Sequence, residues 1–414
     1  MMHYRISYLL PVMTGLLLMT TGCQSKSQIP QTKESTTSGS PVETKKPNAD
    51  YKPAFEGQTR VKSVKTQTEL EITELTDKMK RPWAIIRLPD DRFLVTEKSG
   101  FMRILSAEGQ LMKEIKGLPE VDDENQGGLL DVALDPDFSS NRTIYWSYSE
   151  PQQGGNLTAV AKGRLSSDET KVEDSRVIFR ALPVFNSSLH FGSRLVFDRE
   201  GNLFVSAGER SDLKGRMQAQ DLKSGLGKIF KITKEGKPAP GNPYIGKQGA
   251  MPEIFASGVR NPQGLDIHPV TGELWELEFG PRGGDEVNII RAGKDYGWPT
   301  ITYGIEYSGK PVGDSRTQKE GMEQPVYYWD PVISPSGITF YSSNAIPEWQ
   351  NNLFIGALSG THICRLVIEN NKVVGEERLL EDKGERIRDV LDGRDGALYA
   401  VTDSGKLFRI RKKG

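Results

Sequence analysis

The chain is poor in the residues that crosslink proteins or titrate near neutral pH. Its 414 residues include two cysteines, Cys23 and Cys364, and four histidines. If Cys23 is lipidated as part of an N-terminal targeting segment, Cys364 cannot pair within the chain, and a disulfide scaffold is excluded. Charge of one sign is lacking too, since 54 Lys and Arg balance 55 Asp and Glu. Without a basic excess, no nucleic-acid partner is expected.

The one pronounced apolar run is short for a membrane span. ISYLLPVMTGLLLM occupies residues 6–19, follows Arg5 and leads into TTGC, which ends at Cys23. This pattern resembles a bacterial lipoprotein signal, in which the cysteine is acylated and becomes the new N-terminus. Thr20 stands where lipoproteins usually have Leu, and an ordinary secretion signal is the alternative.

We therefore expect residues 1–23 to be a signal peptide that directs export. A lipid on Cys23 would hold the protein on a bacterial cell membrane, facing away from the cytoplasm. Without the lipid, the protein would be secreted or periplasmic. Residues 24–67 are rich in Ser, Thr, Lys, Gln and Pro. Because they offer few apolar side chains to bury, they are predicted to be a disordered polar linker.

From residue 68 onward, long helical periodicity is almost absent and short apolar runs of strand length recur. RFLVTEKSGFMRIL, NLFVSAGE, ELWELEFG, NLFIGALSG and ALYAVTDSGKLFRI are examples, several preceded by tight turns such as LPDDRF and DGRDGALY. About six such units, 45–75 residues apart, predict an all-β, six-bladed β-propeller over residues 68–414. Two packed β-sandwiches are the alternative. The units begin near Asp90, Asp135, Asp198, His268, Asn344 and Asp392.

Two polar segments beside strands are candidates for chemistry. In ENQGGLLDVALDPDF, Gln126 precedes two glycines that allow a ligand to approach the backbone closely, although a plain hairpin turn also fits. In HFGSRLVFD, His190 is a candidate general base and Arg194 a candidate anion anchor. Taken alone, His190 fits a structural hydrogen-bonding role better.

Three further segments carry charge. GVRNPQG places Arg260 and Asn261 before a proline, where a guanidinium suits a carboxylate or a planar ring. GPRGGDEVN places Asp285 and Glu286 after a glycine-rich loop, a mixture of carboxylates and carbonyls that suits Ca²⁺, although a charged turn fits equally. In ERIRDV, Arg386 and Arg388 lie on one side of a strand and need an anion between them, unless that edge faces solvent.

Taken in order, the motifs RPWAI, QGGLLDVALDPDF, HFGSRLVFD, AQDLKSGLGKIFKI, GVRNPQG, GPRGGDEVN, YGWP and RIRDV resemble the glucose/sorbosone dehydrogenase family. More specifically, they resemble its soluble quinoprotein aldose sugar dehydrogenases, over roughly residues 75–412. The resemblance implies a six-bladed propeller that binds pyrroloquinoline quinone (PQQ) and Ca²⁺ on one face. It also implies oxidation of the C1 hydroxyl of an aldose to a lactone, with electrons leaving to an acceptor of unspecified kind.

Roles carry over from the resemblance position by position. His190 matches the base that takes the C1 hydroxyl proton while a hydride passes to the quinone. Ser359 stands where the family commonly has a lysine aimed at the cofactor, which keeps a hydrogen bond but loses a charge. The resemblance implies cofactor contacts for Gln126, Arg260, Asn261, Tyr307, Arg386 and Arg388. It implies calcium ligands among Gly280, Pro281, Glu286 and Tyr296, beside Asp285.

Two other functions remain open on the sequence alone. A calcium-dependent sugar lactonase has the same fold but centres on a metal held by carboxylates and Asn, and needs no histidine base flanked by arginines. A non-catalytic binding propeller, like the hedgehog-interacting protein that resembles this family, is favoured slightly by the missing lysine. Retention of His190, Gln126, Arg260 and the Arg386/Arg388 pair favours the enzyme. No sequence feature specifies an oligomeric state.

Overall fold

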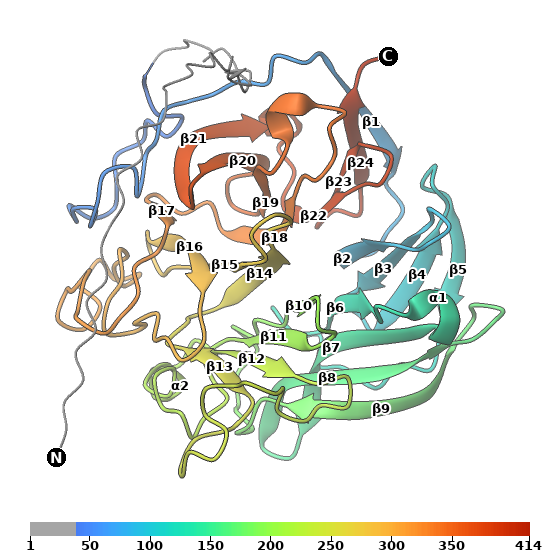
Figure 1. The fold of residues 1–414 in the computed structure, drawn as a ribbon, viewed down its shortest axis with the longest axis horizontal. Coiled ribbons are helices and arrows are strands. Elements are labelled where there is room, and N and C mark those ends of the chain that lie inside the picture. Colours follow the sequence, from blue (N-terminus) through green and yellow to red (C-terminus); the bar gives the residue numbers. More distant parts are fainter. Residues whose placement is uncertain (1–38) are drawn as a thin grey trace, which may run out of the picture. The chain divides into compact units, whose positions relative to one another are not determined.

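Six four-stranded antiparallel sheets are arranged in a ring, and each contributes its first strand to the inside of that ring (Figure 1). The computed structural model describes residues 39–414. Contacts between β2, β6, β10, β14, β18 and β22, the six inner strands, close the ring. The predicted six-bladed β-propeller is therefore confirmed. Among the described residues, no helix has the length and apolarity needed to cross a bilayer.

The first three blades follow in chain order. Blade 1 contains β2 (Pro82–Arg87), β3 (Phe93–Glu97), β4 (Phe101–Leu105) and β5 (Leu111–Ile115). Blade 2 contains β6 (Leu129–Leu134), β7 (Thr143–Gln152), β8 (Gly155–Leu165) and β9 (Val172–Arg180). Blade 3 contains β10 (Leu195–Phe197), β11 (Leu203–Ala207), β12 (Lys228–Ile232) and β13 (Ile254–Ser257).

The last blade combines the two ends of the propeller, because β1 pairs with β24 in antiparallel register from Leu70↔Lys412 onward. Blade 4 contains β14 (Pro262–Ile267), β15 (Leu274–Glu278), β16 (Asp285–Ile290) and β17 (Tyr327–Trp329). Blade 5 contains β18 (Pro335–Phe340), β19 (Leu353–Ala357), β20 (His362–Glu369) and β21 (Lys372–Leu379). Blade 6 contains β22 (Ile387–Asp392), β23 (Leu398–Thr402), β24 (Leu407–Lys412) and β1 (Leu70–Thr76). The short helical turns are α1 (Phe138–Asn141), α2 (Leu213–Arg216), η1 (Pro347–Trp349) and η2 (Glu381–Lys383).

In five of the six blades the second strand is buried on both faces, because a neighbouring blade packs on each side of it. β3, β11, β15, β19 and β23 consist of buried residues throughout. Their sequences, FLVTE, LFVSA, LWELE, LFIGA and LYAVT, are rich in the β-branched and aromatic side chains that fit a pleated surface. Charged residues in these strands, such as Glu97, Glu276 and Glu278, are therefore buried as well.

Alternate pairs of blades are joined by one repeated interaction, an aspartate on an inner strand. Asp131 accepts a hydrogen bond from Leu195 N–H of blade 3 at 2.7 Å. Asp266 accepts one from Phe340 N–H of blade 5 at 2.8 Å. Asp389 accepts one from Ile85 N–H of blade 1 at 2.9 Å. These bonds satisfy backbone donors that no strand pairing reaches, and they fix one inner strand against the next.

The side chain of Arg194 lies where all six inner strands meet. Its guanidinium pairs with Asp131 at 3.3 Å and Asp389 at 3.1 Å, and donates to Gln263 O at 2.7 Å. It also stacks 4.2 Å from the ring centroid of Trp83 on β2. On β18, Gly337 provides the room, because a Cβ there would lie 2.8 Å from Arg194 Nη2.

Residues 39–69, which we call the N-terminal arm, lie against the propeller. Asp330 accepts hydrogen bonds from Asn48 N–H at 2.8 Å and Ala49 N–H at 3.0 Å. The side chain of Gln58 is fully buried, and Thr66 Oγ1 accepts from Trp349 Nε1 at 2.7 Å. The composition assigned residues 39–67 to a disordered linker, but specific polar contacts hold them in place where apolar burial could not. The expected signal segment, Cys23 and linker residues 24–38 lie outside the described residues and stay predictions.

Replacing Asp266 by Ala should lower the free energy of unfolding by about 2–4 kcal/mol. The carboxylate accepts from Phe340 N–H and Ile267 N–H, at 2.8 Å each, and both donors would be left buried without a partner. Urea denaturation followed by tryptophan fluorescence measures the change. Asp314→Ala, at a side chain that is 78% exposed, is the matched control. Equal stability of the two variants would contradict the role of Asp266 in joining blade 4 to blade 5.

Candidate functional site

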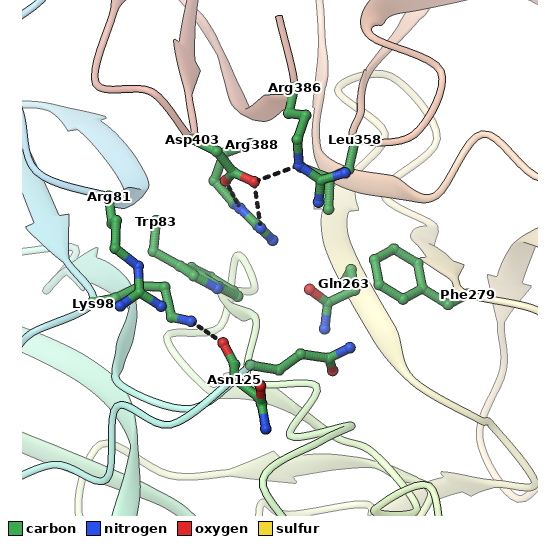
Figure 2. A pocket seen from close by; sticks show the side chains of 11 residues that line it. Arg81, Trp83, Lys98, Asn125, Gln263, Phe279, Leu358, Arg386, Arg388 and Asp403 are labelled. Atoms are coloured by element: carbon green, nitrogen blue, oxygen red, sulfur yellow. Dashed lines mark hydrogen bonds and ion pairs between the residues drawn. The ribbon is translucent and has the colours of Figure 1, made fainter.

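A cavity of about 310 Å³ opens at one end of the propeller axis, where five of the six blades contribute side chains. Two aromatic side chains, Trp83 and Phe279, form part of its wall, and charged groups form much of the rest (Figure 2). Four lining residues are cationic and one is a carboxylate. The lining residues are Arg81, Trp83, Lys98, Asn125, Gln126, Gln263, Phe279, Leu358, Arg386, Arg388 and Asp403.

His190 lies beside this cavity, behind Gln126. Its backbone has a positive φ of 51°, which a hydrogen bond from His190 N–H to Gln126 Oε1 at 2.8 Å holds in place. Its Nδ1 is 2.5 Å from Glu209 Oε1. Because Glu209 accepts at Nδ1, the neutral ring carries its proton there and Nε2 is left as the basic atom. Nε2 has no hydrogen-bond partner among residues 39–414, and the side chain is 5% exposed.

Burial lowers the pKa of His190 to about 4, and the positive charges of Arg260 and Arg210 act in the same direction. The hydrogen bond with Glu209 and its negative charge oppose that shift. The imidazole is therefore neutral at physiological pH and can accept a proton. Sequence reasoning missed Glu209, although it stands in AGER directly after β11.

Gln126, His190 and Asn261 are brought together, as expected. Asn261 Nδ2 is 3.5 Å from Gln126 Oε1, and Asn261 Oδ1 accepts from Gly192 N–H and from Gln263 Nε2, both at 3.1 Å. The network therefore joins the base to the cavity wall. A glycine at position 208 is required here, because a Cβ would lie 2.2 Å from the carbonyl oxygen of His190.

Arg260 acts as a clamp on the following loop. Its Nη1 donates to Phe279 O at 2.9 Å and to Gly280 O at 2.8 Å, and its guanidinium lies 5.1 Å from the centroid of Trp298. The carbonyl of Gly280, one of the expected calcium ligands, thus already faces a cation. Pro281 is buried in the same loop, and no residue among 39–414 donates a hydrogen bond to its carbonyl.

The arginine pair in blade 6 shares one carboxylate, which the sequence did not identify. Arg386 Nε donates to Asp403 Oδ2 and Arg388 Nε donates to Asp403 Oδ1, each at 2.8 Å. Although burial opposes ionisation, Arg388 and Arg386 hold the pKa of Asp403 below its usual value. All three side chains face the cavity (Figure 2). One carboxylate between two guanidinium groups leaves an excess of positive charge.

Five predicted cofactor contacts are not among the residues that line the cavity: Arg260 and Asn261, described above, and Arg194, Ser359 and Tyr307. Arg194 is buried at the propeller axis between Asp131 and Asp389, so it supports Trp83 from behind. Ser359 is exposed and its hydroxyl lies 2.8 Å from that of Ser334. Tyr307 is 71% exposed in the loop that follows β16. Its neighbour Glu306 pairs with Arg216 of α2 at 2.5 Å.

Asp285 and Tyr296 use their polar side-chain atoms within the protein. Asp285 accepts from the backbone N–H groups of Gly280, Ile333 and Ser334, each at 2.8 Å. The hydroxyl of Tyr296 donates to Ile289 O at 2.6 Å and accepts from Arg291 N–H at 2.8 Å. Asp285 therefore fixes this loop through its backbone contacts, and its assignment as a metal ligand stays a prediction.

Blade 4 buries three glutamates whose register places them side by side. Glu276 and Glu278 on β15 lie opposite Asn288 and Glu286 on β16. Glu276 Oε1 and Asn288 Oδ1 have no hydrogen-bond partner within residues 39–414. Burial, and then repulsion from Glu278, raises the pKa of Glu276 well above its usual value. In the described part of the chain, no group of three or more His, Cys, Asp or Glu side chains forms a ready metal cage.

Sequence reasoning also missed Lys98, which lines the cavity next to Arg81. A signal was present, because VTEKSG in blade 1 and VTDSG in blade 6 are equivalent turns after the second strand of their blades. Equivalent turns project into the same end of a propeller. Aligning the two turns would have placed Lys98 and Asp403 at the cavity together.

Comparison with known proteins gives one family. The glucose/sorbosone dehydrogenase model matches residues 79–409. Aldose sugar dehydrogenase YliI of Escherichia coli (strain K12) is 44% identical over 346 residues, 82% of this chain and 92% of the relative. The apo-form crystal structure of the soluble E. coli aldose sugar dehydrogenase superposes with a TM-score of 0.80 at 43% identity, covering 83% of this chain and all of that one. A PQQ-bound aldose sugar dehydrogenase from Streptomyces coelicolor superposes with a TM-score of 0.69 at 25% identity, covering 84% and 99%.

The low pKa of His190 makes a prediction for NMR. The ring resonances of His190 should not titrate between pH 8 and pH 5, because the folded protein protonates this imidazole only near pH 4. Histidine-labelled protein shows few signals, and the signal absent from His190→Gln identifies the residue. A midpoint between pH 6 and pH 7 for that signal would contradict the buried, neutral state.

Proposed function

The chain belongs to the glucose/sorbosone dehydrogenase family, and on that premise we propose that it is a PQQ-dependent aldose sugar dehydrogenase. In this proposal the enzyme oxidises the C1 hydroxyl of an aldose to a lactone and passes two electrons to an external acceptor. The observation that carries it is the cationic, aromatic-walled cavity that opens beside a neutral, buried histidine.

The lining residues fit PQQ, which is planar and has three carboxylates. Arg81, Lys98, Arg386 and Arg388 face the cavity, and Asp403 is the one carboxylate among the lining residues of the described chain. A tricarboxylate would satisfy these donors with charge-assisted hydrogen bonds. Two aromatic side chains, Trp83 and Phe279, offer apolar surface for a planar ring system.

The residues around His190 would perform the proton transfer. Nε2 takes the proton of the C1 hydroxyl as a general base, and Nδ1–H stays hydrogen-bonded to Glu209. Glu209 fixes the tautomer and stabilises the imidazolium that forms, as a carboxylate does in a Ser-His-Asp triad. Gln126 holds the His190 backbone in its strained conformation. The chemistry that PQQ supplies when bound is acceptance of the hydride from C1.

Replacing His190 by Gln should leave PQQ binding within a few-fold and lower kcat by roughly 10²–10⁴, the usual contribution of a general base. Absorbance titration measures binding, and dye reduction with a panel of aldoses measures turnover. His268→Gln is the matched control, because His268 accepts from Val270 and Thr271 N–H in a blade turn outside the cavity.

Two results would overturn this assignment. If the wild-type protein neither binds PQQ nor reduces dye, the proposed function is wrong. If PQQ binds and His190→Gln turns over like the wild type, the cofactor assignment stands and His190 is not the base.

A calcium ion is part of the same proposal, and the buried glutamates of blade 4 support it. Glu286 and Glu278 line a small pocket with Tyr296, whose carbonyl receives no hydrogen bond among residues 39–414. The unpartnered oxygens of Glu276 and Asn288 lie on neighbouring register positions. Carboxylate, amide and carbonyl oxygens are the ligands that Ca²⁺ takes. A cation there would satisfy these oxygens, whereas the carbonyl of Gly280 already accepts from Arg260.

Calcium should raise the melting temperature of the wild-type protein and not that of Glu286→Gln. A ligand at about 100 times its Kd adds about 2.7 kcal/mol to stability, which calorimetry in calcium or chelator resolves readily. Glu320→Gln, at an exposed position in the loop before β17, is the control. If the melting temperature of the wild-type protein is the same in calcium and in chelator, the ion is removed from the proposal and the PQQ assignment stays intact.

A further inference from the structure

The expected lysine at position 359 is replaced by an exposed serine whose hydroxyl faces Ser334. A cofactor with several carboxylates would therefore lack one cation unless another side chain supplies it. We propose that Lys98, with Arg81 beside it, forms a second anion-binding wall that holds one carboxylate of the cofactor. This inference rests on the proposed function and names further residues for the same site.

Lys98 has donors that the protein does not use. The residue is 7% exposed, and its ammonium group faces the cavity. Its one hydrogen-bond partner among residues 39–414 is the backbone carbonyl of Asn125. An ammonium group has three donors, so two remain for a ligand. The adjacent Glu97 is committed elsewhere, because it pairs with Arg103 at 2.9 Å.

Two other buried lysines, Lys228 and Lys162, and the half-buried Lys231 have ammonium groups whose hydrogen-bonding needs are met by the protein. Lys228 donates to three backbone carbonyls at 2.7–2.9 Å. Lys162 pairs with Glu235 at 2.5 Å, and Lys231 pairs with Asp198 at 2.7 Å. Within the described residues, Lys98 has neither a carboxylate partner nor a set of three carbonyls. Its environment is complete only when an anion enters the cavity.

Charge in the cavity supports the same conclusion. Burial lowers the pKa of Lys98 to about 8, and repulsion from Arg81 and Arg388 contributes, against weaker attraction from Asp403 and Asp123. Asp403 is already shared by Arg386 and Arg388. An anion beside Lys98 would relieve this repulsion and keep the ammonium protonated.

The two cationic walls are separate. Figure 2 shows Arg81 and Lys98 together on one side of the cavity and Arg386 and Arg388 on another, with Trp83 between them. A ligand that carries several carboxylates can meet both groups of cations, whereas a compact anion such as phosphate presents a single charged group. Arg81, which is exposed and 3.9 Å from Asp123, stands at the rim of the same wall.

The test compares PQQ binding by Lys98→Gln, Lys98→Arg and the wild-type protein. Gln keeps a donor for the Asn125 carbonyl and removes only the charge, so the fold is retained while affinity falls about 10- to 100-fold. Arg keeps the charge and should bind within a few-fold of wild type. Lys113→Met removes a lysine from the exposed outer strand of the same blade and should have no effect.

A pH series separates a binding role from a structural one. Wild-type affinity for PQQ should fall above pH 8–9 as Lys98 loses its proton, and this dependence should vanish in Lys98→Gln. Equal affinity and equal pH dependence of Lys98→Gln and wild type would overturn the inference while leaving the PQQ assignment standing. Absence of PQQ binding by the wild-type protein would instead overturn the proposed function itself.

Discussion

Arg194 at the propeller axis is the contact on which the rest of the structure depends. Its guanidinium meets two carboxylates, a carbonyl and an aromatic face from four other blades, and the missing side chain of Gly337 makes room for it on the fifth. One cation between Asp131 and Asp389 offsets charges that would otherwise be buried unpaired. The same two aspartates also join neighbouring inner strands, because Asp131 accepts from Leu195 N–H and Asp389 accepts from Ile85 N–H. The residues that pair with Arg194 are therefore the residues that close the ring of blades.

This arrangement has a direct consequence for the cavity. Trp83 forms part of the cavity wall on one face and stacks on Arg194 with the other, and Gln263 lines the cavity with its amide while its carbonyl accepts from Arg194. The floor of the site is thus built from the same side chains that close the propeller. A rigid floor suits a large planar ligand, whose affinity depends on groups that are already in place before it binds.

The sequence could predict the fold because the same pattern of strands and tight turns recurs about six times. Each recurrence independently indicates one four-stranded blade. It also singled out Gln126, His190, Asn261 and the Arg386/Arg388 pair as polar residues beside strands, and the family resemblance gave them roles that stay predictions. It could not separate Arg194 from that set, because the channel and the cavity are both lined by inner-strand residues. Glu209 and Asp403 were missed for a related reason: a carboxylate in a turn reads as a solvent-facing residue until its partner is known. Residues 39–67 were misjudged because composition counts apolar side chains and does not count hydrogen bonds to Asp330 or Trp349.

The distribution of charge around the cavity bears on the serine at position 359, where the family resemblance implies a lysine. A propeller presents equivalent turns from every blade to one end of its axis, so a ligand's charge can be met from any of several walls. In the inference made above, Lys98 in the blade 1 turn, which has no carboxylate partner among residues 39–414, supplies the cation that the blade 5 turn does not. The opposite substitution, a carboxylate at position 98, would leave Arg386 and Arg388, which already share Asp403, and Arg81 at the rim to hold the ligand. The charge balance of the whole ring, more than any single position, therefore decides whether the cavity binds an anion.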